Sequence, residues 1–352
     1  MTETTNQKPT ENESLKEILF ASSQYDGYER LSSSYDQSLK LDFKNDSEFH
    51  KMYVRTLPDL QNGPESLIKG DPVAIEQVGI HNFRLPIKYS MKDSSDLTLE
   101  TSVTGTVSLE AFKKGINMSR IMRSFYKFED QVFTFDTLKN ILDTYRKDLD
   151  SFDANIFLKF SYPIVQDSLR SGNKGWQYYE VIFEGKMCKD GSFKTFMHLD
   201  YVYSSACPCS YELLQHAMEQ RSVTGVPHSQ RSVMRISVEL DYKNADNFWI
   251  EDLKDLALKG LQTETQVVVK REDEQAFAEL NGSYLKFVED AVRIMYKEVK
   301  DVEAIKDFKI VASHQESLHS HDAIASICKG VEGGFVGHVD RETWNSLIHT
   351  VK

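Results

Sequence analysis

The sequence contains few cysteines, no excess of basic residues and no long apolar run. Only four of its 352 residues are cysteine, which is too few for a secreted disulfide framework of this size. The formal net charge of −12 would cause repulsion from an anionic membrane or a nucleic-acid backbone. No stretch approaches the roughly 18 apolar residues of a membrane span, and no signal peptide begins the chain. These absences predict a cytoplasmic protein without nucleic-acid or membrane partners.

Three short motifs are also missing. There is no C-x-x-C pair of the kind that structural zinc sites use, and no P-C-x-x-C signature of zinc nucleobase deaminases. A G-x-x-x-x-G-K-[ST] loop is absent as well, which excludes the Walker way of holding phosphate. The composition, with 40% hydrophobic and 27% charged residues, is that of an ordinary globular protein and predicts one or two domains.

Strand-like and helical segments follow one another in an order that occurs twice. Apolar residues at helical spacing predict helices at 133–149, 249–261 and 283–299. Each half of the pattern reads two strands, one or more helices, and two strands. Runs of β-branched and aromatic residues with rough alternation predict strands, at 78–89, 97–112, 155–162, 177–186, 193–205, 232–241, 308–313 and 323–328.

This order predicts an α+β fold built from two modules. Adjacent strands with helices grouped between them favour antiparallel sheets covered by helices on one face. The turn at 189–192 separates the halves, so we expect a first module at 71–190 and a second at 191–330. Residues 1–70 are polar and predict a partly disordered N-terminal arm, and residues 331–352 form a C-terminal tail.

Two polar motifs stand at the ends of predicted strands. ACPCS at 206–210 ends one strand, and VPHSQRS at 226–232 leads into the next. Such strand ends could bring the thiolate of Cys207 and the imidazole of His228 together as ligands of a divalent metal. Buried, unreactive thiols are an equally good interpretation of this spacing alone.

Further polar side chains could complete such a site. Glu274 lies in the charged run at 270–274, and His319 and His321 are two residues apart. If the HSH segment is extended, both imidazoles share a face and can point into one site. The resulting set of ligands leaves room for water, as a catalytic metal site needs. The competing interpretations are solvated surface for the glutamate and structural roles for the histidines.

Glu289 is a candidate for binding a ligand. In the predicted helix at 283–299 it lies on the side of Leu285, Val292 and Tyr296. Burying a carboxylate costs free energy unless the group is paired. A planar ligand whose edge presents two parallel N–H donors would suit both carboxylate oxygens. A glutamate at the rim of the apolar stripe that reaches water is the alternative.

Basic residues form two short clusters in this acidic chain. KKGINMSR at 113–120 is followed by Arg123, and Arg231 lies in HSQRS. These clusters are candidates to hold a triphosphate through charge-assisted hydrogen bonds, and surface solubility is the alternative. The candidate contacts are Ser119, Arg120, Gln230 and Arg231.

Taken together, six motifs resemble the type IB GTP cyclohydrolases of folate biosynthesis. They occur in the order of that family, between about residues 71 and 329. The resemblance implies the tunnelling fold, with two ββααββ modules in each subunit, and a homotetramer with active sites at subunit interfaces. The motifs are VGIHNFRLPI at 78–87, KGINMSRIMR at 114–123, ACPCS at 206–210, HSQRS at 228–232, FVEDAVR at 287–293 and ESLHSHDA at 316–323.

The resemblance also implies a reaction and roles for the site residues. GTP would be hydrolysed to 7,8-dihydroneopterin triphosphate and formate, beginning with attack of metal-bound water on C8 of guanine. Cys207, His228 and Glu274 would bind one divalent ion, Mn²⁺, Zn²⁺ or Fe²⁺, with His319 contributing to the site or bordering it, and no organic cofactor would be needed. Glu289 would anchor guanine.

Proton transfer is the least defined part of that expectation. His321 and Cys209 are the candidates for it. The chain departs from the motifs common in the family at Asn117, where histidine is common, and at Ser229, where asparagine is common. Both departures bear on phosphate or ribose contacts and leave the expected metal and guanine positions unchanged.

Two other functions remain open at this point. A nitrile oxidoreductase of the same fold would use a nucleophilic cysteine and a nicotinamide cofactor, and it would need no metal. The set of Cys, His, Glu and His argues against that alternative. A non-catalytic metal-binding protein would bind the ion without turning over GTP.

Overall fold

The computed structural model describes residues 55–58, 61, 63–149 and 151–347. Most of the predicted N-terminal arm therefore lies outside the described residues. One compact unit begins at Pro64 and contains all the elements discussed below, starting with a short 3₁₀ helix, η1 (Glu65–Leu67).

Eight strands form one antiparallel sheet in which every strand pairs with its neighbours in the sequence. The alternation of side chains explains this arrangement, since in β4 Tyr179, Val181 and Phe183 are buried at every second position. The strands are β1 (Ile75–Ser90), β2 (Asp96–Leu109), β3 (Ala154–Asp167), β4 (Lys174–Met187), β5 (Phe193–Ala206), β6 (Ser229–Leu240), β7 (Ile305–His314) and β8 (Ala323–Cys328).

Seven α-helices occur among the described residues. Two of them follow the first pair of strands and three follow β6. None has the length and apolar character needed to cross a membrane. The helices are α4 (Met118–Tyr126), α5 (Phe135–Leu149), α6 (Pro208–Arg221), α7 (Ile250–Leu261), α8 (Arg271–Ser283), α9 (Val288–Val299) and α10 (Arg341–Ser346), with a 3₁₀ helix η2 (Ala245–Asn247) before α7.

The predicted α+β fold with an antiparallel sheet is confirmed. The first half has the order ββααββ, and the second half repeats it with α6 between its first two strands and a third helix before β7. The predicted boundary at 189–192 lies in the turn between β4 and β5, and these two strands pair with each other. The sheet is thus continuous across the proposed module boundary.

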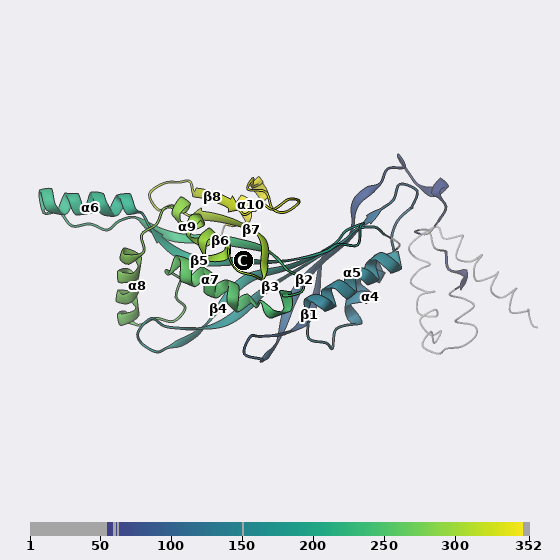
Figure 1. Cartoon of the computed structure of the whole chain (residues 1–352), viewed down its shortest axis with the longest axis horizontal. Helices are drawn as coiled ribbons and strands as arrows, with labels where there is room; N and C mark the ends of the chain where they lie inside the picture. The colour runs from purple at the N-terminus through teal and green to yellow at the C-terminus, as the bar shows by residue number, and fades with distance from the viewer. Residues whose placement is uncertain (1–54, 59–60, 62, 150, 348–352) are drawn as a thin grey trace, which may run out of the picture. The chain divides into compact units, whose positions relative to one another are not determined.

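The main core lies between the sheet and the helices. Helices α4 and α5 contact β1–β4, and α7 and α9 contact β5, β7 and β8 (Figure 1). Close approach of α5 to β4 depends on Gly185, because a Cβ atom there would lie 2.7 Å from Cδ2 of Leu138. In each half, therefore, a pair of helices covers the strands that precede and follow it.

The predicted C-terminal tail packs on the sheet as far as it is described. Val339 and Leu347 are buried against Val233 and Val311. Val233 and its neighbour Met234 belong to different apolar clusters, because successive side chains of a strand point to opposite faces. The tail therefore covers the face of β6 and β7 opposite the main core.

Candidate functional site

Cys207 and His228 lie side by side where β5 ends and β6 begins. The last paired residues of these strands are Ala206 and Ser229, so the next residue on one strand faces the preceding residue on the other. The main-chain N–H of Cys207 donates to the carbonyl of His228 over 3.1 Å. Cys207 is also the N-cap of α6, and the chain turns into that helix at Pro208. A thiol-bearing and an imidazole-bearing residue are therefore neighbours at one end of two central strands of the sheet.

The imidazole of His228 is surrounded by oxygen atoms on its Nδ1 side. Oε1 of Gln230 and Oε2 of Glu316 each lie 3.3 Å from Nδ1. The approach of Glu316 satisfies the distance of an ion pair but lacks the angles of a hydrogen bond, and its buried Oε2 has no hydrogen-bond partner. Gln230 also donates to Ser205 Oγ over 2.8 Å. This arrangement leaves Nε2 of His228 available to a ligand.

Glu316 is a further candidate for the site, and it was not predicted from the sequence. Only 11% of its side chain is exposed, although glutamate is normally a surface residue. Its position at the start of the ESLHSHDA motif was a usable signal. The prediction considered only the two histidines of that motif as ligands.

Glu274 lies in the first turn of α8 and is exposed. The start of α8 is held by the neighbouring Asp273, which is fully buried and accepts hydrogen bonds from the main-chain N–H groups of Arg170 and Ser171. A hydrogen bond from the Ser171 hydroxyl, together with these bonds and one from the N–H of Lys270, lowers the pKa of Asp273 far below its usual value despite burial. The turn between β3 and β4 thereby fixes the helix that carries Glu274.

The described residues of one chain do not gather a complete metal site. No group of three or more His, Cys, Asp and Glu side chains that could hold an ion is present in this part of the chain. Cys207 and His228 are brought together, whereas Glu274 is not brought to them. Any site that uses Glu274 with these two residues therefore needs a further movement or a second chain.

His319 and His321 are exposed, and their rings stack with centroids 4.8 Å apart. The segment is not extended, because residues 317–321 form a bend between β7 and β8. The bend nevertheless places the two imidazoles together. Cys209 is likewise exposed, in the first turn of α6.

Glu289 is exposed in the first turn of α9. Of the two positions that the sequence left open, the structure shows the one at the rim of the apolar stripe, and the helix begins at Val288, so that Leu285 lies outside it. The main-chain N–H of Phe287 donates to Asp290, which helps to define this later start. Just before the helix, the N–H of Lys286 donates to the carbonyl of Ala206 over 3.3 Å. The start of α9 is thus hydrogen-bonded to the strand end that carries Cys207.

Basic side chains line a polar hollow of about 450 Å³ beside α4. Arg120, Arg123 and Lys127 contribute to it from one helix, and Asp148 of α5 is the acidic member. Arg120 donates to the main-chain carbonyl of Asp148, and Lys127 lies 3.8 Å from its carboxylate. Three cations against one carboxylate give this hollow a net positive charge.

The remaining predicted contacts lie near the two groups already described. Ser119 is exposed and donates to Asn117 Oδ1 over 2.6 Å, so Asn117 orders the start of α4. Gln230 is half-buried beside His228, and Arg231 is exposed on β6. Ser229 is exposed as well.

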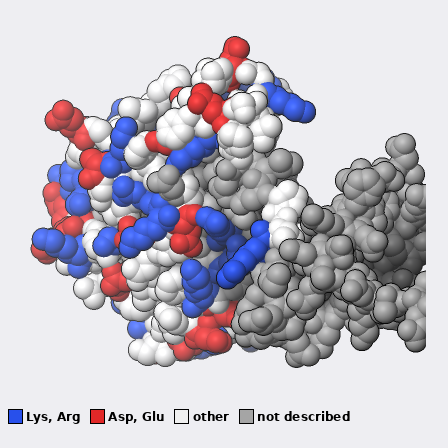
Figure 2. Space-filling model, turned by 90° about the vertical axis from the view of Figure 1, so that its right-hand side faces the viewer, with Lys and Arg blue, Asp and Glu red and all other residues white. Residues whose placement is uncertain are grey.

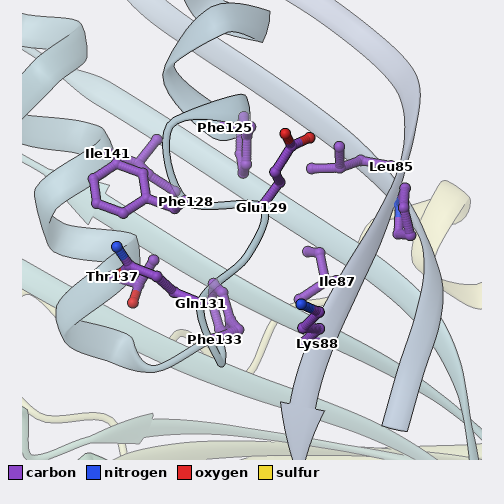
Figure 3. A pocket seen from close by; sticks show the side chains of 11 residues that line it. Leu85, Ile87, Lys88, Phe125, Phe128, Glu129, Gln131, Phe133, Thr137 and Ile141 are labelled. Atoms are coloured by element: carbon purple, nitrogen blue, oxygen red, sulfur yellow. The ribbon is translucent and has the colours of Figure 1, made fainter.

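Another pocket between β1 and the α4–α5 region is apolar. Figure 3 shows Leu85 and Ile87 of β1 facing Phe125, Phe128 and other side chains of the helical layer. This cavity measures about 20 Å³, which is about the space that one water molecule needs. None of the predicted site residues lines it.

Comparison with known proteins identifies the family. Residues 57–325 match the family described as Type I GTP cyclohydrolase folE2. The chain is 54% identical to a GTP cyclohydrolase FolE2 of Jannaschia sp. (strain CCS1) over 311 residues, which cover 88% of this chain and 84% of the relative. It is also 54% identical to a GTP cyclohydrolase FolE2 of Cereibacter sphaeroides (strain KD131 / KCTC 12085), with 92% of this chain and 86% of the relative covered.

Among solved structures, the uricase of Arthrobacter globiformis matches with a TM-score of 0.45 and 9% identity, over 77% of this chain and 97% of that chain. A match of this quality carries no argument about function. The sequence matches, in contrast, extend over most of the chain at high identity. The chain therefore belongs to the type I GTP cyclohydrolase FolE2 family.

Proposed function

We propose that this GTP cyclohydrolase of folate biosynthesis opens the guanine imidazole ring at a divalent metal held by Cys207, His228 and Glu274. Family membership gives the reaction class. The observation that carries the proposed site is the pairing of Cys207 with His228 at the β5–β6 strand ends. GTP, with its guanine C8 between two nitrogens, offers the electrophilic carbon that such a site would attack.

The residues present suit a divalent ion. A thiolate and an imidazole are ligands that Zn²⁺ accepts, and a carboxylate extends the set to Mn²⁺ or Fe²⁺. The buried Oε2 of Glu316 has no hydrogen-bond partner, and its place beside Nδ1 favours a proton there and leaves Nε2 unprotonated for coordination. When bound, the ion would supply Lewis-acid activation of the water that adds to C8.

The other side chains would bind the substrate and handle protons. Glu289 would accept two N–H groups from the guanine edge through its two carboxylate oxygens. Cys209, His319 and His321 would donate and accept protons as C8 leaves as formate and the opened ribose rearranges and recloses. His319 would also border the metal.

A neighbouring subunit would complete the site. Glu274 is exposed and lies outside any metal-binding group among the described residues of one chain, and α6, which follows Cys207, has no buried residue. Leu213 and Met218 of this helix are exposed by 70% and 48%, which suits burial against another protein surface. We propose a homotetramer of two-module subunits in the cytoplasm, with each active site at a subunit interface.

The hollow beside α4 would hold the triphosphate. Figure 2 shows Lys and Arg side chains gathering on the face of the molecule at this end of the sheet. Arg120 and Arg123 belong to the basic cluster that the sequence predicted for this role, and the hollow adds Lys127. Guanidinium groups suit phosphate because their N–H donors match its oxygens in pairs. The hollow and the metal ligands would come together across the subunit interface.

This assignment predicts the effect of removing one cation. Arg123→Gln should raise KM for GTP by about 5- to 10-fold, since a charge-assisted bond at an exposed site contributes on the order of 1 kcal/mol. The inhibition constant of guanosine, which has no phosphate, should be the same for the variant and the wild type. Steady-state kinetics measure both quantities. Lys147→Gln, an exposed lysine of α5 outside the hollow, is the control, and an unchanged KM in Arg123→Gln would contradict the assignment.

Glu316 should tune the affinity for metal. Glu316→Gln keeps the shape of the side chain but removes the negative charge beside Nδ1 of His228. We expect the affinity for Mn²⁺ to fall by about 10- to 100-fold, as is typical when the partner of a metal-binding histidine is lost. Titration calorimetry measures it, with the exposed Glu332→Gln as control. Equal affinities for Mn²⁺ in the Glu316 variant and the wild type would rule out this role.

A direct assay tests the proposed function as a whole. The purified protein is incubated with GTP and Mn²⁺, and the product is oxidised and read as neopterin fluorescence. We expect turnover that is lost with a chelator and restored by added metal. Turnover that persists in the metal-free protein would contradict the proposed mechanism.

A further inference from the structure

We propose that Lys286 is a positioning residue that sets the distance between Glu289, the proposed guanine anchor, and Cys207, the proposed metal ligand. This inference rests on the function proposed above for those two residues. Lys286 is three positions before Glu289 in the sequence and is itself 3% exposed. A side chain so completely buried is suited to support other groups rather than to bind a ligand from solution.

Two hydrogen bonds tie Lys286 to the end of β5. Its main-chain N–H donates to the carbonyl of Ala206, the residue before Cys207, over 3.3 Å. Its ammonium Nζ donates to Oγ1 of Thr263 over 3.2 Å, and Thr263 in turn donates to the carbonyl of Ser204. Main chain and side chain thus attach the start of α9 to two points of the same strand, which restricts both its distance and its orientation.

The ammonium of Lys286 lies among neutral groups. No ion pair reaches it within the described residues, and its nearest aromatic ring is that of Tyr203, with the centroid 5.9 Å from Nζ. Tyr203 is fully buried and hydrogen-bonded to Nε2 of His314 over 2.8 Å. Burial and the charge of Lys286 lower the pKa of His314 to about 3, which keeps that imidazole neutral. Burial likewise lowers the pKa of Lys286 to about 8.

Such a lysine is unfavourable for folding. An ammonium removed from water without a counter-ion costs free energy. The unfolded chain holds the Lys286 proton up to its ordinary pKa of 10.5, whereas the folded chain loses it near pH 8. The cost is therefore fully present below pH 8 and disappears as the pH rises toward 10.5. If Lys286 served mainly to stabilise the fold, removing its charge would lower the Tm. If it serves to position Glu289, removing its charge should lower kcat while the Tm stays the same or rises.

Lys286→Met tests this difference, because it keeps the aliphatic stem and removes the ammonium. We expect kcat for GTP to fall by roughly 10- to 100-fold, since small misplacement of reacting groups has effects of that size. KM should stay within about threefold, and Mn²⁺ binding should be retained. The Tm at pH 7 should equal or exceed that of the wild type, and the difference should shrink toward pH 10. Lys297→Met, at an exposed lysine of α9, serves as the control.

Variants at Thr263 provide a second line of evidence. Thr263→Ser keeps the acceptor for Lys286 and should retain kcat, whereas Thr263→Val should lower it. The double variant Thr263→Val/Lys286→Met should have a kcat no lower than that of the more impaired single variant, because both substitutions remove the same hydrogen bond. A wild-type kcat in Lys286→Met, a Tm that falls together with kcat, or loss of Mn²⁺ binding would each overturn the proposal. Metal binding by a Cys207→Ala protein would instead refute the proposed site, and it is measured separately.

Discussion

Replacing Cys207 with alanine should lower the turnover of GTP by at least about 10³-fold. The loss follows from removing the only thiol ligand, since a catalytic metal contributes several kcal/mol to transition-state stabilisation and about 1.4 kcal/mol corresponds to a tenfold change in rate. The Mn²⁺ or Zn²⁺ content of the purified protein should fall with the activity. Fluorescence of oxidised neopterin and elemental analysis measure the two effects on the same sample.

Cys188 provides the matched control for this experiment. It is a free cysteine in the turn between β4 and β5, with the same half-buried status as Cys207. Cys188→Ala should retain both turnover and metal. Full activity in Cys207→Ala would show that the thiol is no ligand, and an equal loss in the two variants would indicate a general effect on folding.

Replacing Glu289 with alanine should raise KM for GTP by roughly 100-fold. The carboxylate is proposed to accept two N–H groups of guanine, and hydrogen bonds to a charged group contribute about 1.5–3 kcal/mol each. The effect on kcat should be smaller, because Glu289 is not assigned to the reacting carbon. Steady-state kinetics with GTP separate the two constants, and Glu303→Ala, an exposed glutamate after α9, is the control.

Inosine triphosphate sharpens this test, because its base lacks the exocyclic amino group of guanine. The wild-type enzyme should strongly prefer GTP, since a site built for two N–H donors leaves an oxygen unpaired with the analogue. Glu289→Ala should lose most of this preference. A variant that still discriminates as well as the wild type would show that another group recognises the guanine edge.

The sheet could be predicted from the sequence because apolar residues recur at every second position along several of its strands. In β4 and β5, buried side chains recur at every second position, such as Val181 and Phe183 or Met197 and Leu199, which distinguishes strand from helix. Consecutive strands joined by short turns then pair as neighbours. The adjacency of Cys207 and His228 follows directly, because each stands where one of two paired strands ends.

The helices that the prediction missed carry no comparable pattern. Helix α6 has no buried residue. The charged residues in the first turn of α8 are typical of a solvated surface segment. Helix α4 lies in a basic cluster whose charges obscured Ile121 and Phe125, the buried side chains of its apolar face. A helix whose apolar face is narrow or unpartnered within one chain has little periodicity to reveal it.

The site was only partly predictable for a related reason. Glu316 lies beside His228 through the pairing of β6 with β7, a contact between residues 88 positions apart. Nothing in local spacing signals such a neighbour. In the proposed site, Glu274 joins the other ligands only from a neighbouring subunit, and the hydrogen bond from the N–H of Phe287 to Asp290 lies at the start of α9. Residue types and strand ends indicated the chemistry, while tertiary contacts determine the geometry.

Anomalous diffraction from crystals of the Mn²⁺-loaded enzyme tests the central claim most directly. We predict one metal peak for each subunit, within bonding distance of Cys207 Sγ, His228 Nε2 and a carboxylate oxygen of Glu274 from the same or a neighbouring subunit. A peak bound to other side chains would contradict the account, as would an assembly in which Cys207 and Glu274 stay far apart in every pairing of subunits.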